Sequence, residues 1–91
     1  IRPNSLFGLR RIILLFLNFN KLYLIKNNTF NGLENLEILY LDNNELRILE
    51  DNAFSGLNNL TILYLNNNYL EILSSCLFRN LGKLKRVLIK W

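Results

Sequence analysis

The sequence predicts an α/β-type solenoid, mostly β-strand and irregular coil, as a right-handed stack with one parallel sheet on its concave face. Two observations predict this fold. An apolar frame recurs without insertion or deletion, and successive copies start at 24-residue intervals, at Leu9, Leu33, Leu57 and Leu81. Within each copy, strict period-two alternation is confined to a short central segment, which indicates one short strand followed by a turn and a looser return. A fixed period of this length is typical of coils that bury their apolar faces against each other.

Three full copies and two partial copies make up the predicted stack. Residues 1–8 match the tail of a copy, residues 9–32, 33–56 and 57–80 are full copies, and residues 81–91 match the head of another. We expect parallel strands about 4.8 Å apart at residues 15–17, 39–41, 63–65 and 87–89. Neither end carries the polar cap that solenoids generally require. We therefore expect an uncapped fragment of a longer array, with Leu81 and Leu84 exposing core surface at one end.

Two kinds of side chain repeat after each strand. One is aromatic, and should stack on the wall opposite the sheet, among irregular or short helical turns: Phe30, Phe54 and Phe78. The other is an amide: Asn20, Asn44 and Asn68. A buried asparagine both donates and accepts hydrogen bonds, so it can satisfy the turning backbone and link one coil to the next. We expect these three residues to form a structural asparagine ladder.

The repeated pattern LxxLxLxxNxL, followed by Leu or Ile and then Phe, resembles the leucine-rich repeat in its 24-residue form. That resemblance implies an extracellular protein, such as a Toll-like receptor, a Slit-type guidance protein, a platelet adhesion receptor or a small matrix proteoglycan. The chain departs from the family pattern where the family often has proline, at Lys26, Glu50 and Ser74. These departures bear on the subfamily and not on the fold.

Composition argues against catalytic and metal chemistry within this chain. It contains no histidine, and Cys76 is the only cysteine. No set of nucleophile, base and orienting group can be assembled from these residues, and metal sites built on His or Cys are excluded. We predict no enzyme activity and no cofactor. No apolar run approaches the roughly 18 residues of a membrane span, so we expect no membrane contact by this segment. Cys76 either packs as a buried thiol or pairs outside the segment.

Charge is distributed in bands along the stack. Residues 9–32 carry four basic side chains and no acidic ones, whereas residues 33–56 carry six acidic residues and one arginine. Residues 81–91 are again basic. Binding to a nucleic acid backbone needs basic charge along the whole groove, and the acidic band interrupts it. The sequence therefore predicts that nucleic acid is an unlikely partner.

Two stretches have the pattern that accepts an N-linked glycan, starting at Asn27 and Asn59. Both residues should lie off the face of the sheet. We treat them as glycosylation candidates of a secreted parent protein.

The side chains between the frame leucines are the candidates for binding. On a solvent-facing sheet, outward positions should be polar, but two outward columns are apolar or aromatic in almost every copy. Their members are Leu14, Phe16, Ile38, Tyr40, Ile62, Tyr64 and Leu88. One interpretation is cross-strand stacking that stabilises the sheet. The other is a contact surface on the concave face for a protein or other macromolecule.

These observations favour a ligand-binding segment of an extracellular or cell-surface receptor ectodomain, with a Toll-like receptor as the favoured class. A secreted matrix or adhesion protein, in which the repeats mainly serve as a scaffold, is the alternative.

Overall fold

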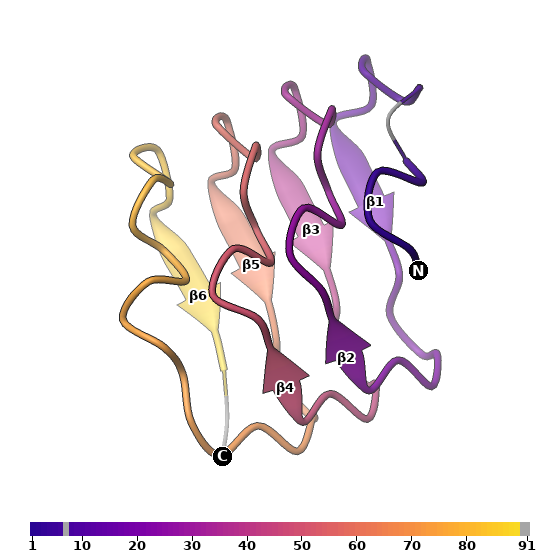
Figure 1. The fold of residues 1–91 in the computed structure, drawn as a ribbon, viewed down its shortest axis with the longest axis vertical. Coiled ribbons are helices and arrows are strands. Elements are labelled where there is room, and N and C mark those ends of the chain that lie inside the picture. The colour runs from indigo at the N-terminus through magenta and orange to yellow at the C-terminus, as the bar shows by residue number, and fades with distance from the viewer. Residues whose placement is uncertain (7, 90–91) are drawn as a thin grey trace.

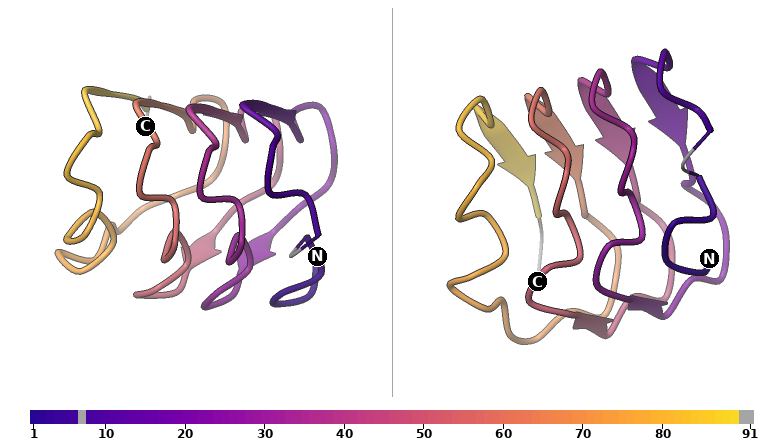
Figure 2. Two further views of the ribbon diagram at one scale, coloured as in Figure 1. Left: turned by 90° about the horizontal axis from the view of Figure 1, so that it is seen from above. Right: turned by 45° about the horizontal axis from the view of Figure 1, so that its top comes forward.

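The computed structural model describes residues 1–6 and 8–89. Its coils stack side by side, and one strand of each coil joins a four-stranded parallel sheet in the order β1-β3-β5-β6 (Figure 1). A second sheet of two parallel strands, β2 and β4, lies on the other side of the core (Figure 2). The strands are β1 (Leu14–Phe16), β2 (Leu24–Ile25), β3 (Ile38–Tyr40), β4 (Ile48–Leu49), β5 (Ile62–Tyr64) and β6 (Arg86–Leu88).

The register of the large sheet repeats the spacing of the sequence. Leu15 pairs with Leu39, Leu39 with Leu63, and Leu63 with Val87. Each strand residue therefore pairs with the equivalent residue of the next coil. This register keeps the frame leucines on the inner side of the sheet in every coil. The predicted solenoid with a parallel sheet is confirmed.

Each strand of the large sheet lies one residue earlier than predicted. The amide of Leu41 still donates to the Tyr64 carbonyl of the next coil, at 2.9 Å. The carbonyl oxygen of Leu41, however, accepts hydrogen bonds from the side chains of Asn44 and Asn68, at 3.1 and 3.0 Å. Because asparagine amides take this carbonyl, the backbone ladder stops before the last leucine of the predicted strand.

The return side is more regular than the sequence predicted. Leu24 pairs with Ile48 and Ile25 with Leu49, and the Glu50 amide continues this ladder by donating to the Ile25 carbonyl at 3.0 Å. Residues 1–6 and 8–89 contain no helix, so the expected short helical turns are not found there. Part of the return side instead forms a short two-stranded sheet. Because every coil has the same length, equivalent backbone groups of neighbouring coils are aligned on this side as well.

The core is a column of leucines closed by phenylalanine. The frame leucines of residues 33–56 are at most 8% exposed, and Phe30 and Phe54 are at most 1% exposed. The Phe30 and Phe54 rings stack with centroids 6.1 Å apart, and Phe54 and Phe78 stack at 6.2 Å, as predicted. Rings on the outer side of the large sheet lie closer, at 4.4 and 4.5 Å. The closer spacing on that side fits a stack whose concave face carries the sheet.

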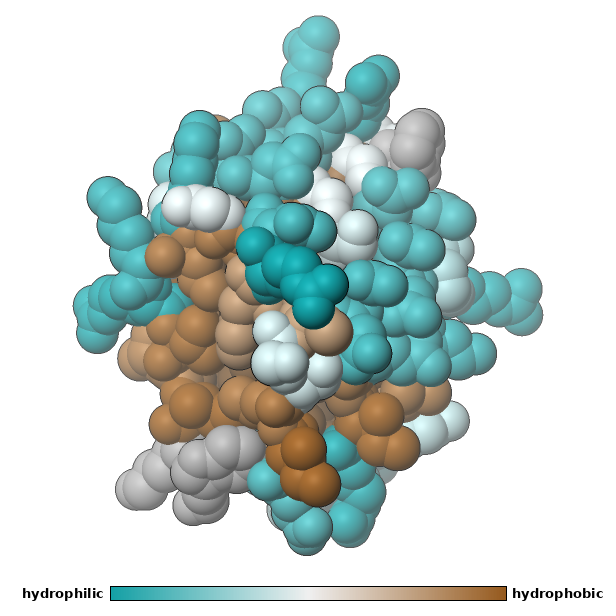
Figure 3. Space-filling view, turned by 60° about the vertical axis from the view of Figure 1, so that its left-hand side comes forward, coloured by the Kyte–Doolittle hydropathy of each residue, from teal (hydrophilic) through white to brown (hydrophobic). Residues whose placement is uncertain are grey.

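Hydrophobic side chains gather on the surface at the β6 end of the stack (Figure 3). Leu84 is half-buried there, but Leu81 is only 7% exposed. The prediction that Leu81 exposes core surface is therefore wrong, because its side chain belongs to the buried cluster formed with the preceding coils. The last predicted partial copy extends to Lys90 and Trp91, which lie outside the described residues.

In the three full copies, the residue two positions after the last leucine of the Leu-x-Leu segment has a left-handed backbone. Phe19, Asn43 and Asn67 have φ angles of 57°, 56° and 59°. Asparagine tolerates this conformation, whereas a residue such as phenylalanine pays roughly 1–2 kcal/mol for it. Phe19 is also 75% exposed. Of these three equivalent residues, Phe19 is therefore the one whose side chain disfavours the left-handed backbone conformation.

We expect Phe19→Asn to raise the free energy of unfolding by about 1 kcal/mol, because asparagine relieves the backbone strain. Amide hydrogen exchange at the residues around Phe19 in the full-length protein measures this, because it reports the free energy of local unfolding. Phe19→Ala is the control, since alanine removes the ring but keeps the strained backbone. Equal stability changes in the two variants would contradict the role of the left-handed conformation.

Candidate functional site

An aromatic column runs across the outer side of the large sheet. Phe16 stacks on Tyr40 with ring centroids 4.4 Å apart and an interplanar angle of 11°, and Tyr40 stacks on Tyr64 at 4.5 Å and 8°. Leu88 pairs with Tyr64 in the sheet and extends the column. Phe16 is 60% exposed, and the other three are half-buried. Sheet register produces this stack because all four residues occupy the same place in their copies.

A second, aliphatic column lies beside the aromatic one. Leu14 pairs with Ile38, Ile38 with Ile62, and Ile62 with Arg86. Leu14 is 46% exposed, and the two isoleucines are half-buried. All seven residues singled out in the sequence therefore lie side by side on one face. The aliphatic column ends at the charged Arg86. We call the seven residues the apolar face.

Asparagine side chains connect the coils at the end of the strands. Asn44 Nδ2 donates to the Leu17 carbonyl at 3.0 Å, and Asn44 Oδ1 accepts from the Leu22 amide at 3.1 Å. Asn68 repeats this one coil later, donating to the Leu41 carbonyl and accepting from the Leu46 amide. These bonds join each coil to the one before it.

Asn20 departs from the predicted ladder: it is exposed, and its side-chain hydrogen bonds among the described residues lie within its own coil. Its Nδ2 donates to the carbonyls of Leu17 and Asn18, at 3.0 and 3.1 Å.

An open groove of about 660 Å³ crosses the coils where the strands begin. One of its columns carries cations at the ends and amides between them: Arg11, Asn35, Asn59 and Lys83. The other column contains Ile13, Glu37 and Thr61. The sequence analysis did not single out this groove, although the same 24-residue spacing aligns its lining residues.

The two glycosylation candidates have different surroundings. Asn27 is exposed on the return side, where its Oδ1 accepts from the Asn52 amide at 2.8 Å. Asn59 is half-buried in the groove, and its Nδ2 donates to the Glu34 carbonyl at 2.6 Å while its Oδ1 accepts from Lys83 at 2.7 Å. Asn59 lies in the turn ahead of β5 and outside the strands, as the sequence predicted.

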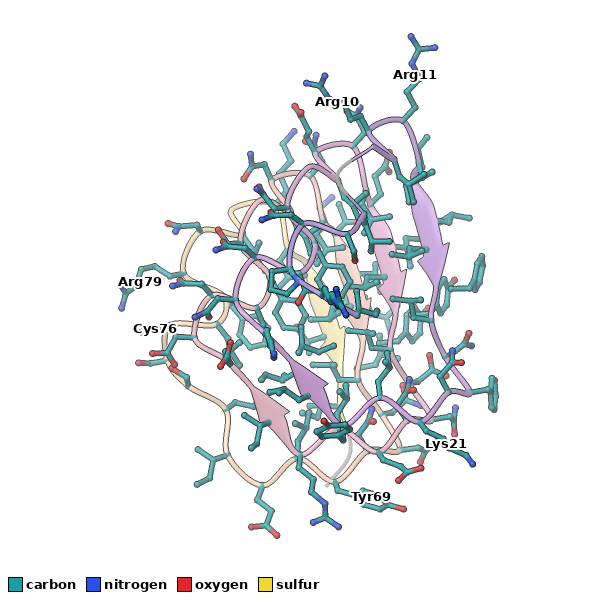
Figure 4. The ribbon with its side chains drawn as sticks, turned by 45° about the vertical axis from the view of Figure 1, so that its right-hand side comes forward. Arg10, Arg11, Lys21, Tyr69, Cys76 and Arg79 are labelled. Carbon is teal, nitrogen blue, oxygen red and sulfur yellow. The ribbon has the colours of Figure 1, made fainter. Side chains whose placement is uncertain are left out.

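The basic residues of the first full copy do not form one patch. Arg10 and Arg11 project at the end of the molecule where the strands begin, whereas Lys21 lies at the opposite end (Figure 4). Arg10 is also paired with Glu34 of the acidic copy, with 3.2 Å between Nη2 and Oε1.

Cys76 lies on the return side, away from the large sheet (Figure 4). It is a free thiol of intermediate burial, and Arg79 Nη2 approaches its Sγ at 3.1 Å. The expectation that Cys76 packs as a fully buried thiol is therefore wrong.

Catalytic, metal and membrane features were searched in the same structure. Over residues 1–6 and 8–89, no group of three or more His, Cys, Asp or Glu side chains converges as metal ligands would. The same part of the chain holds no helix that is long and apolar enough to cross a membrane.

Comparison with known proteins agrees with this architecture. Residues 34–90 match the family model described as leucine rich repeat. The chain belongs to the leucine-rich repeat family. Among solved structures, it is similar to the TLR13 chain in a crystal structure of a TLR13–ssRNA13 complex, with a TM-score of 0.80 and 40% sequence identity over 82% of its length. No curated protein matches the sequence.

This leucine-rich repeat segment therefore resembles part of a Toll-like receptor ectodomain, as its sequence pattern predicted. It covers 11% of the TLR13 chain. The likeness concerns the scaffold, and function on such a scaffold depends on the particular side chains that it presents.

Proposed function

We propose that this leucine-rich repeat segment belongs to the ectodomain of a Toll-like receptor at the cell surface, and that its apolar face binds a protein ligand. The stacked column of Phe16, Tyr40 and Tyr64 is the observation that carries the proposal. It places exposed or half-buried rings where a solvent-facing sheet should be polar.

Stacking alone accounts for only part of this arrangement. Cross-strand pairs stabilise a sheet by roughly 0.2–1 kcal/mol each, and that gain does not require the neighbouring aliphatic column. Two adjacent apolar columns make a continuous surface of the kind that marks a macromolecular contact. Tyrosine suits such a contact because it joins a large ring to a polar tip. The two roles are compatible, and mutation separates them.

Single-stranded RNA is a second candidate ligand. The similar TLR13 structure is a complex with ssRNA13, so the comparison does not support the expectation that nucleic acid is an unlikely partner. Arg11 and Lys83 of the groove, together with rings on which bases can stack, would favour such a strand. We rank it second because Glu37 lies between the two cations of the groove.

A scaffold role in a secreted matrix or adhesion protein remains the non-receptor alternative. In all of these versions we infer a segment without catalytic activity or a cofactor. We also propose that Asn27, whose exposed turn lies away from the apolar face, is a better glycan acceptor than Asn59.

Tyr40→Ala and Tyr64→Ala should each weaken ligand binding by more than about 1 kcal/mol if the rings are anchors. The full-length protein is first screened against purified secreted proteins and against single-stranded RNA. Affinities of the variants for the ligand found are then measured on a biosensor.

Tyr23→Ala is the matched control, because this tyrosine is 66% exposed but lies outside the apolar face. Asn52→Ala and Ser75→Ala, on the exposed return side, should also leave affinity unchanged. If the Tyr40 and Tyr64 variants lower the melting temperature but keep full affinity, the column is structural and the binding proposal fails.

A further inference from the structure

Asp42 is a buried carboxylate with an unused acceptor. It lies two residues beyond Tyr40 and is only 9% exposed. Asn43 Nδ2 donates to Asp42 Oδ2 at 2.8 Å, whereas Asp42 Oδ1 is buried and accepts no hydrogen bond from residues 1–6 or 8–89. Burying a charged group without full pairing destabilises a fold. This oxygen therefore needs a donor.

Asn66 presents a second acceptor of the same kind in the next coil. Its Oδ1 is also buried without a partner. Asp42 and Asn66 occupy the same position in their copies, and their neighbours Tyr40 and Tyr64 are paired across β3 and β5. The two unused oxygens thus belong to adjacent coils, two residues beyond the Tyr40–Tyr64 pair along the chain.

The chemistry of this pair selects a positively charged donor. Two acceptors, one of them ionised, are best satisfied by a group that donates more than one hydrogen bond and carries positive charge. The copy that contains Asp42 has six acidic residues and one basic residue, which disfavours a phosphate and favours a cation. Asp42 makes no salt bridge within the described part of the chain.

We propose that Asp42 and Asn66 bind the ammonium group of a lysine side chain on the protein ligand, with Tyr40 and Tyr64 alongside. This inference rests on the proposed function, because it names the chemistry that the ligand brings to the apolar face. Because both oxygens are buried, the proposal includes an outward turn of the Asp42 side chain when the ammonium group binds.

Asp42→Asn separates this role from a structural one. Asparagine already occupies the equivalent positions 18 and 66, and its amide would place a donor beside the unused oxygen of Asn66. The variant should therefore melt at or above the wild-type temperature while losing its attraction for a cation.

The test uses the full-length protein and two synthetic peptides, Ac-Gly-Gly-Lys-Gly-Gly-NH₂ and the same peptide with norleucine in place of lysine. Binding is followed by the NMR signals of the Tyr40 and Tyr64 rings. The lysine peptide should bind the wild type, and Asp42→Asn should weaken it by about tenfold or more. The norleucine peptide should not bind. Asn66→Ala, which removes the other acceptor, should weaken binding of the lysine peptide less than Asp42→Asn does, and it serves as the test if Asp42→Asn does not fold.

Three results would overturn the proposal. Equal affinity of wild type and Asp42→Asn for the lysine peptide would place binding elsewhere. Failure of the lysine peptide to bind the wild type, with a lower melting temperature for Asp42→Asn, would indicate that a bound water or a turned Asn66 amide satisfies the carboxylate. Failure of the lysine peptide to bind the wild type, with an unchanged or higher melting temperature for Asp42→Asn, would show that the two acceptors do not bind an ammonium group. In each case the tyrosine variants still test the proposed function independently.

Discussion

Replacing Phe54 with alanine should lower the stability of the central coils by about 3–5 kcal/mol. Phe54 is 1% exposed and stacks on Phe30 and on Phe78, so its removal opens a cavity between three coils. A long repeat array does not unfold in one step. Amide hydrogen exchange at Leu39 and Leu63 is therefore the measurement, since it reports local opening.

Phe19→Ala is the matched control for Phe54→Ala. It removes the same ring from a site that is 75% exposed, so protection of the central amides should change by less than about 0.5 kcal/mol. Similar losses in the two variants would contradict the claim that the buried phenylalanine column holds the coils together.

Asn44→Ala should destabilise the junction between the first and second full copies by about 1–3 kcal/mol. The cost comes mainly from one group, the Leu22 amide, which donates to Asn44 Oδ1. The carbonyls of Leu17 and Leu41 keep bonds from Asn20 and Asn68 respectively. The orphaned Leu22 amide should therefore show the largest gain in exchange rate.

Asn20→Ala provides the comparison for Asn44→Ala. Asn20 is exposed, and water can replace its bonds, so the change should cost less than about 1 kcal/mol. If Asn20→Ala is as damaging as Asn44→Ala, the link between coils is not the source of the effect.

The fold could be predicted because one physical requirement recurs in every coil. Leu15, Leu39 and Leu63 must face the same core, and equal copy length forces their register. The same argument places Tyr40 beside Tyr64, so the apolar face also follows from the spacing. The exact end of each strand did not follow, because it depends on whether a carbonyl bonds to a strand or to an asparagine side chain.

Other features depend on contacts that spacing does not determine. The β2–β4 sheet forms from segments with only two paired residues each, too short for a periodic signal. The unused oxygens of Asp42 and Asn66 become visible only once burial and every donor are known. A sequence signal did exist for Phe19, since its equivalents Asn43 and Asn67 are residues that tolerate a left-handed backbone.

Oxidative footprinting of the four tyrosines tests the central proposal most directly, because two lie on the apolar face and two do not. Tyr23 and Tyr69 are 66% and 54% exposed away from that face, whereas Tyr40 and Tyr64 belong to the stacked column. The full-length protein is labelled with and without its ligand. We expect protection of Tyr40 and Tyr64 and unchanged labelling of Tyr23 and Tyr69. Protection of Tyr23 or Tyr69, with Tyr40 and Tyr64 unchanged, would contradict binding through the apolar face.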